Sequence, residues 1–310
     1  MNPCAIVTGA SSGIGKATAL ELHQNGWKVY AGARRTDRME SLAEKGITSL
    51  PLDVTKENSM TTFVQKVLDS EGRIDALINN AGYGSYGAIE DVPLEEARQQ
   101  FELNVFGLAR MIQLVLPTLR SRQAGRIINI SSIGGTLGEP HGAWYHATKF
   151  SVEGLSDSIR MELAQFGIDV VVIQPGAIQT EWSEIARGRL SEISADGAYA
   201  DMAGKHAAML ERFDSRGSAP EVVSRAVLKA CNSRRPKTRY RVGQAAHAMA
   251  WLRRLLSNPA WISTIAESRY EPSKPERAFS IDLTPDTVFS EIFERLFDHS
   301  TLLYLSEPGR

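Results

Sequence analysis

The sequence predicts an α/β protein in which a doubly wound, seven-stranded parallel sheet is flanked by helices. Up to about residue 177, short runs rich in β-branched and aliphatic residues alternate with longer stretches of helical periodicity, which is the pattern of βαβ units. Several short runs are almost wholly apolar, as residues 127–130 and 170–173 show, and such runs suit strands that are covered on both faces.

The elements are predicted in chain order from these two patterns. Strands are expected at residues 5–8, 28–32, 48–52, 76–79, 126–131, 169–174 and 239–242. Helices are expected at residues 14–25, 57–70, 94–121, 146–166 and 220–232. Pro117 lies near the end of the long third helix and is expected to bend or shorten its last turn, because proline has no N–H to donate.

The regular alternation gives way after residue 177. Residues 178–217 form a polar stretch that is too long for an ordinary connection, so a lid on a first domain of residues 1–242 is predicted, with a plain surface excursion as the alternative. Residues 243–310 are expected to form a helical extension that packs on the same domain, with a short helix at 286–297. Its amphipathic part, 243–268, has three possible placements: over the cleft, against a partner subunit or on a membrane surface. Packing in the core or over the cleft is favoured, because the stretch holds only two arginines and a membrane-surface helix is usually more basic.

Composition excludes several classes of protein. The chain has 35 Lys and Arg against 36 Asp and Glu, and this balance argues against electrostatic capture of nucleic acid. Two cysteines, Cys4 and Cys231, are too few and too far apart for a disulfide framework or a four-thiolate zinc site, so no metal is expected. No window approaches the roughly 18 apolar residues that span a bilayer, and the N-terminal run does not resemble a signal peptide. We therefore expect a cytoplasmic protein with no integral membrane segment.

A glycine-rich turn joins the first strand to the first helix. Gly9, Gly13 and Gly15 stand where the backbone must approach a pyrophosphate closely, and the helix N-terminus offers free N–H donors and the positive end of its dipole. The spacing is not that of a nucleoside triphosphatase, because Lys16 is not part of a G-K-[ST] loop. The turn predicts a dinucleotide site, although a tight turn alone is the alternative for three isolated glycines.

From this turn onward the chain resembles the short-chain dehydrogenase/reductase family, whose first turn has the form T-G-x3-G-x-G. The resemblance covers roughly residues 4–242 as an ordered series of motifs: an N-A-G element, an asparagine on the following helix, a serine, a Y-x3-K pair and a Pro-Gly pair with a nearby threonine. These motifs fall at Asn80, Ala81, Gly82, Asn104, Ser132, Tyr145, Lys149, Pro175, Gly176 and Thr180. The resemblance implies a Rossmann-fold oxidoreductase, and its NADP-type pattern and length are similar to those of the steroid and retinol dehydrogenase branch.

The end of the second strand predicts the choice of cofactor. Ala33 stands where an acidic residue would bind the adenosine ribose and repel a 2′-phosphate. Arg34 and Arg35 follow, and guanidinium groups bind phosphate in a bidentate fashion. NADP is therefore preferred and NAD is expected to bind less well, unless the two arginines are only a solvated pair.

The turn and the resemblance together imply one set of cofactor-binding residues, in which Ser11 adds a hydroxyl donor to the phosphate and Asp53 and Val54 hold the adenine. The set is Gly9, Ser11, Ser12, Gly13, Ile14, Gly15, Arg34, Asp53, Val54, Asn80, Ala81, Gly82, Tyr145, Lys149, Pro175, Gly176 and Thr180.

Moving a hydride between an alcohol and nicotinamide requires an acid/base, a donor to the oxygen and a cation, and Tyr145, Ser132 and Lys149 match these needs. A free tyrosine has a pKa near about 10, so a nearby ammonium must stabilise the phenolate. Lys149 lies one helical turn from Tyr145 on the same face and can also reach the nicotinamide ribose. Asn104 is expected to anchor a water that relays protons from Lys149 to solvent.

The substrate is predicted from departures from the family pattern. His141 and Trp144, shortly before Tyr145, are expected to line or shape the pocket together with Trp182. Bulky residues after Gly176 would give an apolar lid, and such a lid suits a hydrophobic ketone or alcohol such as a steroid, a retinoid or an aromatic carbonyl compound. These lid residues are Trp182, Tyr199, Met202 and Met209.

Two other classes of protein share these features. A non-catalytic Rossmann protein that senses NADP has no need of the serine, tyrosine and lysine, and this argues against it. An epimerase or an enoyl reductase on the same fold is the other alternative, although the enoyl reductases typically space the tyrosine and lysine more widely. The long helices 94–121 and 146–166 resemble those at the family's subunit interfaces, so a homodimer or homotetramer is expected.

Overall fold

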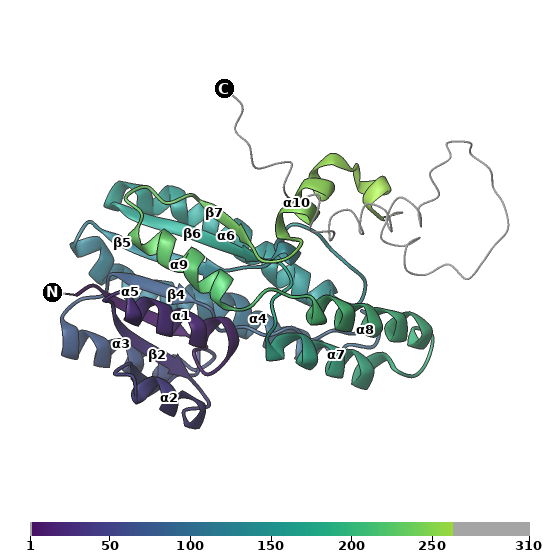
Figure 1. The fold of residues 1–310 in the computed structure, drawn as a ribbon, viewed down its shortest axis with the longest axis horizontal. Helices are drawn as coiled ribbons and strands as arrows, with labels where there is room; N and C mark the ends of the chain where they lie inside the picture. The colour runs from purple at the N-terminus through teal and green to yellow at the C-terminus, as the bar shows by residue number, and fades with distance from the viewer. Residues whose placement is uncertain (1, 263–310) are drawn as a thin grey trace.

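A computed structural model describes residues 2–262 and confirms the predicted parallel sheet (Figure 1). The strands are β1 Cys4–Thr8, β2 Lys28–Ala33, β3 Thr48–Pro51, β4 Ala76–Asn79, β5 Gly125–Ile130, β6 Ile168–Pro175 and β7 Arg239–Val242. They lie in the order β3-β2-β1-β4-β5-β6-β7, and every neighbouring pair is parallel. Each strand falls within one residue of its predicted bounds.

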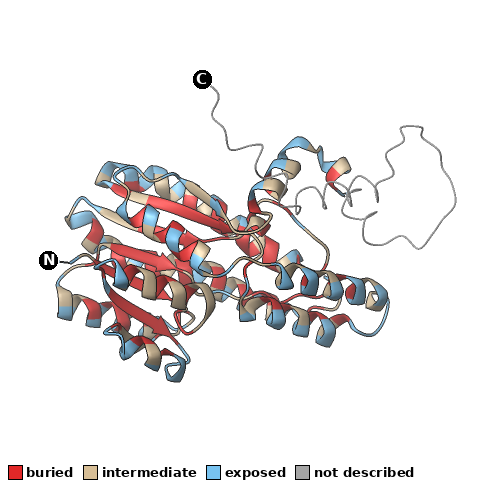
Figure 2. Ribbon diagram, viewed as in Figure 1, coloured by how far each residue is buried: buried red, intermediate tan, exposed pale blue. Residues whose placement is uncertain are grey.

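Helices cover both faces of the sheet. One face carries α1 Gly13–Gln24, α2 Glu40–Ala43 and α9 Glu221–Asn232, and the other carries α3 Glu57–Glu71, α5 Leu108–Ser121 and α6 Ala143–Leu163. In β1, Ala5 and Val7 pack into the first layer, while Cys4 and Ile6 pack into the second. The inner strands β1, β2, β4, β5 and β6 are consequently buried over most of their length, as Figure 2 shows, and this is why they appear in the sequence as largely apolar runs. The edge strands β3 and β7 are mostly half-buried.

The prediction of one continuous helix over residues 94–121 is wrong. It is divided into α4 Leu94–Phe101, a π-helical turn Glu102–Gly107 and α5, which begins at Leu108. The π turn contains Asn104, and such turns occur frequently at functional sites. Pro117 does not shorten the helix, because α5 continues past it to Ser121, and the bend that was the other expectation remains a prediction.

Residues 178–217, predicted as a long irregular lid, contain two helices instead. These are α7 Glu181–Ser194 and α8 Ala200–Ser215, which pack on each other and project beyond the sheet (Figure 1). Their buried stripes include Ser183, Ser194 and His206 beside Leu190 and other apolar residues. Small and polar residues in these stripes interrupt the hydrophobic period that predicts a helix.

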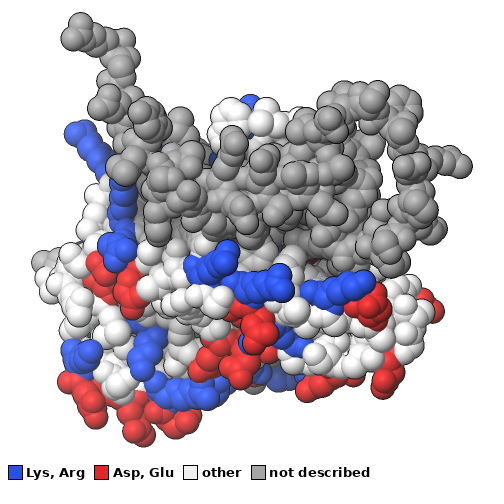
Figure 3. All heavy atoms as spheres, turned by 45° about the vertical axis from the view of Figure 1, so that its right-hand side comes forward, with Lys and Arg blue, Asp and Glu red and all other residues white. Residues whose placement is uncertain are grey.

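The C-terminal stretch forms α10, Ala246–Leu255, followed by Trp261. Met249 and Leu252 of this helix pack with Leu137 and Trp261 beside the end of β5, so this part of the stretch packs on the sheet domain. The predicted helix at 286–297 lies outside the described residues. Within residues 2–262, no helix is both long and apolar enough to cross a membrane. On the face drawn in Figure 3, acidic and basic side chains are interspersed over the described surface.

Candidate active site

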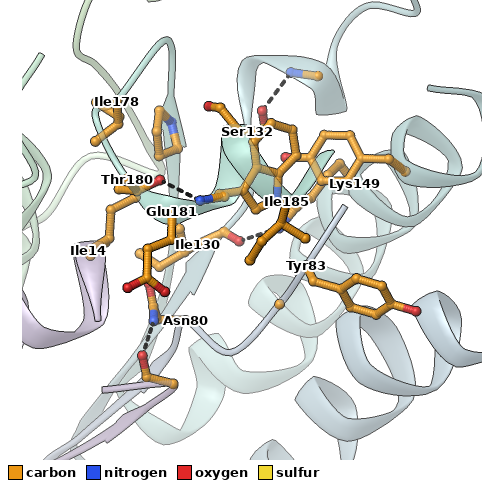
Figure 4. Close-up of a pocket in the computed structure, with 18 of the residues that line it drawn as sticks. Ile14, Asn80, Tyr83, Ile130, Ser132, Lys149, Ile178, Thr180, Glu181 and Ile185 are labelled. Carbon is orange, nitrogen blue, oxygen red and sulfur yellow. Dashed lines mark hydrogen bonds between the residues drawn. The ribbon is translucent and has the colours of Figure 1, made fainter. Parts of the chain in front are cut away.

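The strand order reverses between β1 and β4, and the carboxyl ends of these two strands border a cavity of about 520 Å3 (Figure 4). Crevices at such reversal points are where open α/β sheets bind their ligands. The cavity walls come from the turn after β1, the ends of β2 and β4 to β6, the helices α6 to α8, and Met249 of α10. One cavity therefore joins the predicted dinucleotide residues, apart from Gly15, to Ser132, Tyr145 and Lys149, while Asn104 does not line it.

The glycine turn is locked to the loop that follows β4. Thr8 Oγ1 accepts hydrogen bonds from the backbone N–H groups of Asn80 and Ala81, each at 3.0 Å. The Asn80 side-chain amide donates to the carbonyl oxygens of Thr8 and Gly9 at 3.0 and 3.2 Å. A Cβ on Gly15 would lie 2.3 Å from the Gly9 oxygen, so only glycine permits this approach. The turn thus presents bare backbone to the cavity, which fits a pyrophosphate.

Replacing Gly15 with alanine is expected to weaken binding of both NADPH and NADH at least about tenfold, because the added methyl group must displace the Gly9 carbonyl or the Asn80 amide. Titration by tryptophan fluorescence measures this loss. Gly154→Ala is the matched control, since that glycine is also helical but has open space around it, and the control should bind both nucleotides as the parent does. Wild-type affinity in Gly15→Ala would contradict the assignment of the turn.

Ser132, Tyr145 and Lys149 meet at the cavity wall. Ser132 follows β5, and its Oγ accepts a hydrogen bond from the Gly134 N–H at 3.0 Å. Tyr145 lies in the first turn of α6 and Lys149 one turn later, with Nζ 5.8 Å from the centre of the Tyr145 ring. The Lys149 ammonium donates to the Ile130 carbonyl at 3.0 Å, which fixes the long side chain across the end of β5.

Burial changes the pKa of both titrating groups. It raises the pKa of Tyr145 to about 12, where a hydrogen bond with Ser132 acts in the opposite direction and the charge of Glu139 adds to the rise. Burial lowers the pKa of Lys149 to about 8, although the charge of Glu153 opposes this. Tyr145 is therefore held as a phenol that can give a proton to a carbonyl oxygen, and it requires a positive charge nearby to take one back.

Asn104 ties the loop after β4 to α6. Its side-chain oxygen accepts from the Tyr83 N–H at 3.0 Å, and its amide donates to the Tyr83 carbonyl at 2.9 Å and to Thr148 Oγ1 at 3.1 Å. Thr148 in turn donates to the Tyr145 carbonyl at 2.7 Å. Asn104 thereby positions the helix that carries the tyrosine and lysine, and the predicted proton relay through a water remains a prediction.

The adenosine end of the cavity is basic. Arg34 and Arg35 both line it, and Arg35 also lies within 3.5 Å of the hydroxyls of Ser11 and Ser12. Burial raises the pKa of Asp53, but hydrogen bonds from Thr55 and the charge of Arg34 outweigh it, so the carboxyl remains ionised. This keeps Asp53 able to accept a hydrogen bond from an adenine amino group.

One contact at this end was not predicted from sequence. Glu181, the first residue of α7, accepts two hydrogen bonds from Arg38 at 2.7 and 2.9 Å and forms an ion pair with Arg35. It links the lid to the loop after β2. No local pattern signals a contact between residues so far apart in sequence.

At the substrate end of the cavity, the structure differs in part from the predicted set of pocket residues. Trp182 lines the cavity, with its ring centre 4.9 Å from that of Tyr145. Trp144 and His141 are not among the lining residues: Trp144 packs edge-on against Phe101, and His141 is buried with its Nδ1 3.0 Å from that of His206. Tyr86, Glu139 and His146, which were not predicted, line it instead, together with Met249 of the amphipathic stretch 243–268, for which capping of the cleft was one of the alternatives.

A parallel sheet with a glycine turn at its reversal point, and a tyrosine beside a serine and a lysine in the same cavity, are features typical of oxidoreductases that use a nicotinamide dinucleotide. A family model described as short chain dehydrogenase matches residues 3–189. The chain belongs to the short-chain dehydrogenase family.

The relatives agree with this class. The chain is 36% identical over 253 residues to a 3-ketodihydrosphingosine reductase of Bacteroides thetaiotaomicron, covering 80% of this chain and 92% of that protein. It is 33% identical over 246 residues to an NADPH-dependent 3-dehydrocapnine reductase of Ornithobacterium rhinotracheale, covering 76% and 86%. The crystal structure of a short-chain dehydrogenase from Streptomyces avermitilis superposes with a TM-score of 0.73 at 30% identity, covering 86% and 97%.

Proposed function

We propose that the protein is an NADPH-dependent carbonyl reductase that moves a hydride between the nicotinamide and a hydrophobic ketone or secondary alcohol, with NADH as a weaker cofactor. The observation that carries this proposal is the meeting of Ser132, Tyr145 and Lys149 in the cavity that also contains the glycine turn. Two relatives whose names describe reductases of keto compounds support it.

The residues present fit a nicotinamide dinucleotide. The glycine turn offers bare backbone for the pyrophosphate, Arg34 and Arg35 offer charge for a 2′-phosphate, and Thr180 lines the cavity at the start of the lid. When bound, the nicotinamide supplies or accepts the hydride.

The chain's own residues handle the proton. Tyr145 donates its phenolic proton to the carbonyl oxygen as the alcohol forms, and Ser132 donates a hydrogen bond to the same oxygen, where the developing negative charge strengthens it. Lys149, charged when protonated, lies on the ring side of Tyr145 and stabilises the phenolate that remains. The direction of net reaction follows the cellular ratio of the two nucleotides.

An apolar substrate suits the remaining wall of the cavity. Aliphatic, aromatic and sulfur-containing side chains from α7, α8, α10 and the loop after β5 face the space beside Tyr145. They are Leu137, Trp182, Ile185, Met209, Leu210, Phe213 and Met249. A long-chain ketone, a steroid or a retinoid would bury its apolar surface here, which favours binding by roughly 25 cal/mol per Å2 of apolar area removed from water.

The domain assignment and oligomer are part of the same proposal. Residues 1–242 are assigned to the catalytic domain and the lid to 178–217, and the described part of the extension, residues 243–262, packs on this domain through the contacts of Met249. A homodimer or homotetramer through α4 to α6 would cover Phe106 and Phe150, which are exposed there. We place the protein in the cytoplasm, since Cys4 and Cys231 are unpaired.

Arg34→Ala is expected to weaken NADPH binding about ten- to a hundredfold, because a charge-assisted bond to a phosphate contributes roughly 1.5–3 kcal/mol, and to leave NADH binding within about threefold. Parallel titrations with the two nucleotides measure the difference. Arg38→Ala is the control, because Arg38 pairs with Glu181 and does not line the cavity. An equal loss for both nucleotides would contradict a phosphate-binding role.

The function itself is tested by a panel of hydrophobic ketones with NADPH, followed at the nicotinamide absorbance and including steroid, retinoid, aromatic and long-chain carbonyl compounds. Turnover of any ketone supports the reductase. Nucleotide binding without turnover of any member would instead favour the sensor, and turnover only of an α,β-unsaturated carbonyl at its double bond would favour an enoyl reductase.

A further inference from the structure

The first turn of the lid places a carboxylate beside the glycine turn. Glu181, the first residue of α7, lines the cavity and is labelled in Figure 4. Thr180, just before it, lies against the glycine turn, because a Cβ added to Gly13 would come within 3.1 Å of the threonine methyl group. Glu181 is therefore a charged group at the phosphate-binding end of the cavity, and the chemistry described so far gives it no part.

Glu181 shares a guanidinium with the predicted phosphate site. Both terminal nitrogens of Arg35 face Oε2 of Glu181, at 3.4 and 3.5 Å. The Arg35 Nη2 also lies 3.3 Å from the hydroxyl oxygen of Ser12 and 3.5 Å from that of Ser11, which is the hydroxyl expected to bind the 2′-phosphate. An arginine binds a phosphate most strongly through two parallel N–H bonds. If Arg35 binds a 2′-phosphate through the same two nitrogens, it has to release the carboxylate.

Glu181 would stay close to the site after such an exchange, because it has a second cationic partner. Arg38 donates to both of its oxygens, at 2.7 and 2.9 Å, and does not line the cavity. The side chains of Arg35, Arg38 and Glu181 are 44–46% exposed, so water screens their charges in part. We therefore expect Glu181 to change nucleotide affinity by a few-fold and not by orders of magnitude.

We propose that Glu181 is a specificity-determining residue for the nucleotide, because it competes with the 2′-phosphate of NADPH for Arg35 and so narrows the preference for NADPH over NADH. This deepens the proposed function and depends on its NADPH preference. NADH carries a hydroxyl at the 2′ position and leaves the pair of Arg35 and Glu181 intact. NADPH replaces the carboxylate on Arg35 with a phosphate and brings two negatively charged groups close together, which costs binding free energy.

The ratio of the two affinities isolates this effect. Both nucleotides carry the pyrophosphate, so its repulsion from Glu181 affects them alike. A change in the position of the lid would also affect them alike, since Trp182, the next residue, lies at the substrate end of the cavity with its ring 4.9 Å from that of Tyr145. Only the 2′-phosphate differs between NADPH and NADH, and a change in the ratio therefore reports on it.

The test measures binding to the full chain by isothermal titration calorimetry. Glu181→Gln keeps the size of the side chain and removes its charge, and we expect it to raise the ratio of NADPH to NADH affinity about fivefold at low salt. The ratio for the fragments adenosine 2′,5′-bisphosphate and 5′-AMP should rise by a similar factor. Glu184→Gln is the matched control, because Glu184 is an exposed acid in the same turn of α7 that does not line the cavity, and it should leave both ratios unchanged.

Two further readouts distinguish competition for charge from a structural effect of the substitution. The gain in Glu181→Gln should disappear in about 1 M salt, where the Debye length is about 3 Å, whereas an altered lid would persist. In an Arg35→Ala background, adding Glu181→Gln should raise the ratio less than twofold, because the group for which the carboxylate competes is gone. Melting curves establish that each variant is folded.

The outcomes separate the two proposals. An equal change for both nucleotides in Glu181→Gln, a gain that is independent of salt, or the same gain without Arg35 would overturn the role of Glu181 and leave the NADPH-dependent reductase intact. Equal binding of NADPH and NADH by the parent protein, together with equal binding of the two fragments, would overturn the cofactor preference and the role of Glu181 together.

Discussion

Tyr145→Phe is expected to lower turnover of any ketone substrate about a thousandfold, because it removes the proton donor and general acid–base catalysis contributes roughly 10²–10⁴ in rate. Binding of NADPH should remain within about threefold of the parent value. The phenylalanine ring keeps the packing of Tyr145 against Tyr86 and Trp182, whose ring centres lie 5.9 and 4.9 Å away. Steady-state rates and a fluorescence titration on the same preparation measure the two quantities.

Tyr83→Phe is the matched control for this variant. Tyr83 also lines the cavity, but its hydroxyl donates to Glu96 at 3.3 Å and points away from Ser132 in Figure 4. Its loss should change turnover far less than the loss of the Tyr145 hydroxyl. Turnover retained in Tyr145→Phe would overturn the catalytic assignment, whereas loss of nucleotide binding would show that the hydroxyl acts mainly on the cofactor.

Lys149→Met is expected to abolish most turnover and yet to stabilise the fold near pH 7. Burial lowers the pKa of Lys149 from its ordinary value of 10.5 to about 8 in the folded chain, so the unfolded state binds more protons between these two pH values. The buried ammonium therefore costs about 3 kcal/mol below pH 8, and this cost disappears as the pH rises towards 10.5. Losing the hydrogen bond to Ile130 costs roughly 1 kcal/mol in return, leaving a net gain of about 2 kcal/mol at pH 7.

Urea denaturation of the parent and the variant at pH 7 and at pH 10 measures this difference. The variant should be the more stable protein at pH 7, and the advantage should shrink or reverse at pH 10. Lys205→Met, at an exposed position where the lysine pairs with Asp201, should show no comparable change with pH. A constant difference between the parent and Lys149→Met at both pH values would contradict a depressed pKa.

The parallel sheet follows from local sequence because its strands are buried on both faces. An apolar run such as residues 170–173 would expose hydrophobic side chains to water in a surface strand, so it indicates a strand that is covered on both faces. The residues that follow each strand of a parallel sheet lie at the same edge of that sheet. The motifs after β1, β4 and β5 were therefore predicted to meet, and Gly9, Asn80 and Ser132 do line one cavity.

The lid helices and the π turn were not predictable in the same way. The buried positions of α7 and α8 include Ser183, Ser194 and His206. Ser194 accepts a hydrogen bond from the Ala88 N–H and His206 contacts His141, and both of these partners lie far away in the sequence. Asn104, in the π turn that divides the predicted helix, bonds to Tyr83 and Thr148, and both partners lie more than 20 residues away in the sequence.

The family, the parallel sheet and the candidate tyrosine, serine and lysine were all predicted from sequence, because they depend on short motifs or on strands buried on both faces, whereas the strand order comes from the structure. Only the tertiary structure decided which neighbours of Tyr145 face the substrate. Successive residues of a helix point about 100° apart, so Trp144 packs against Phe101 while Tyr145 faces the cavity. Glu139 and Met249 reach the same wall from a loop and a distant helix, and this convergence exists only in the folded chain.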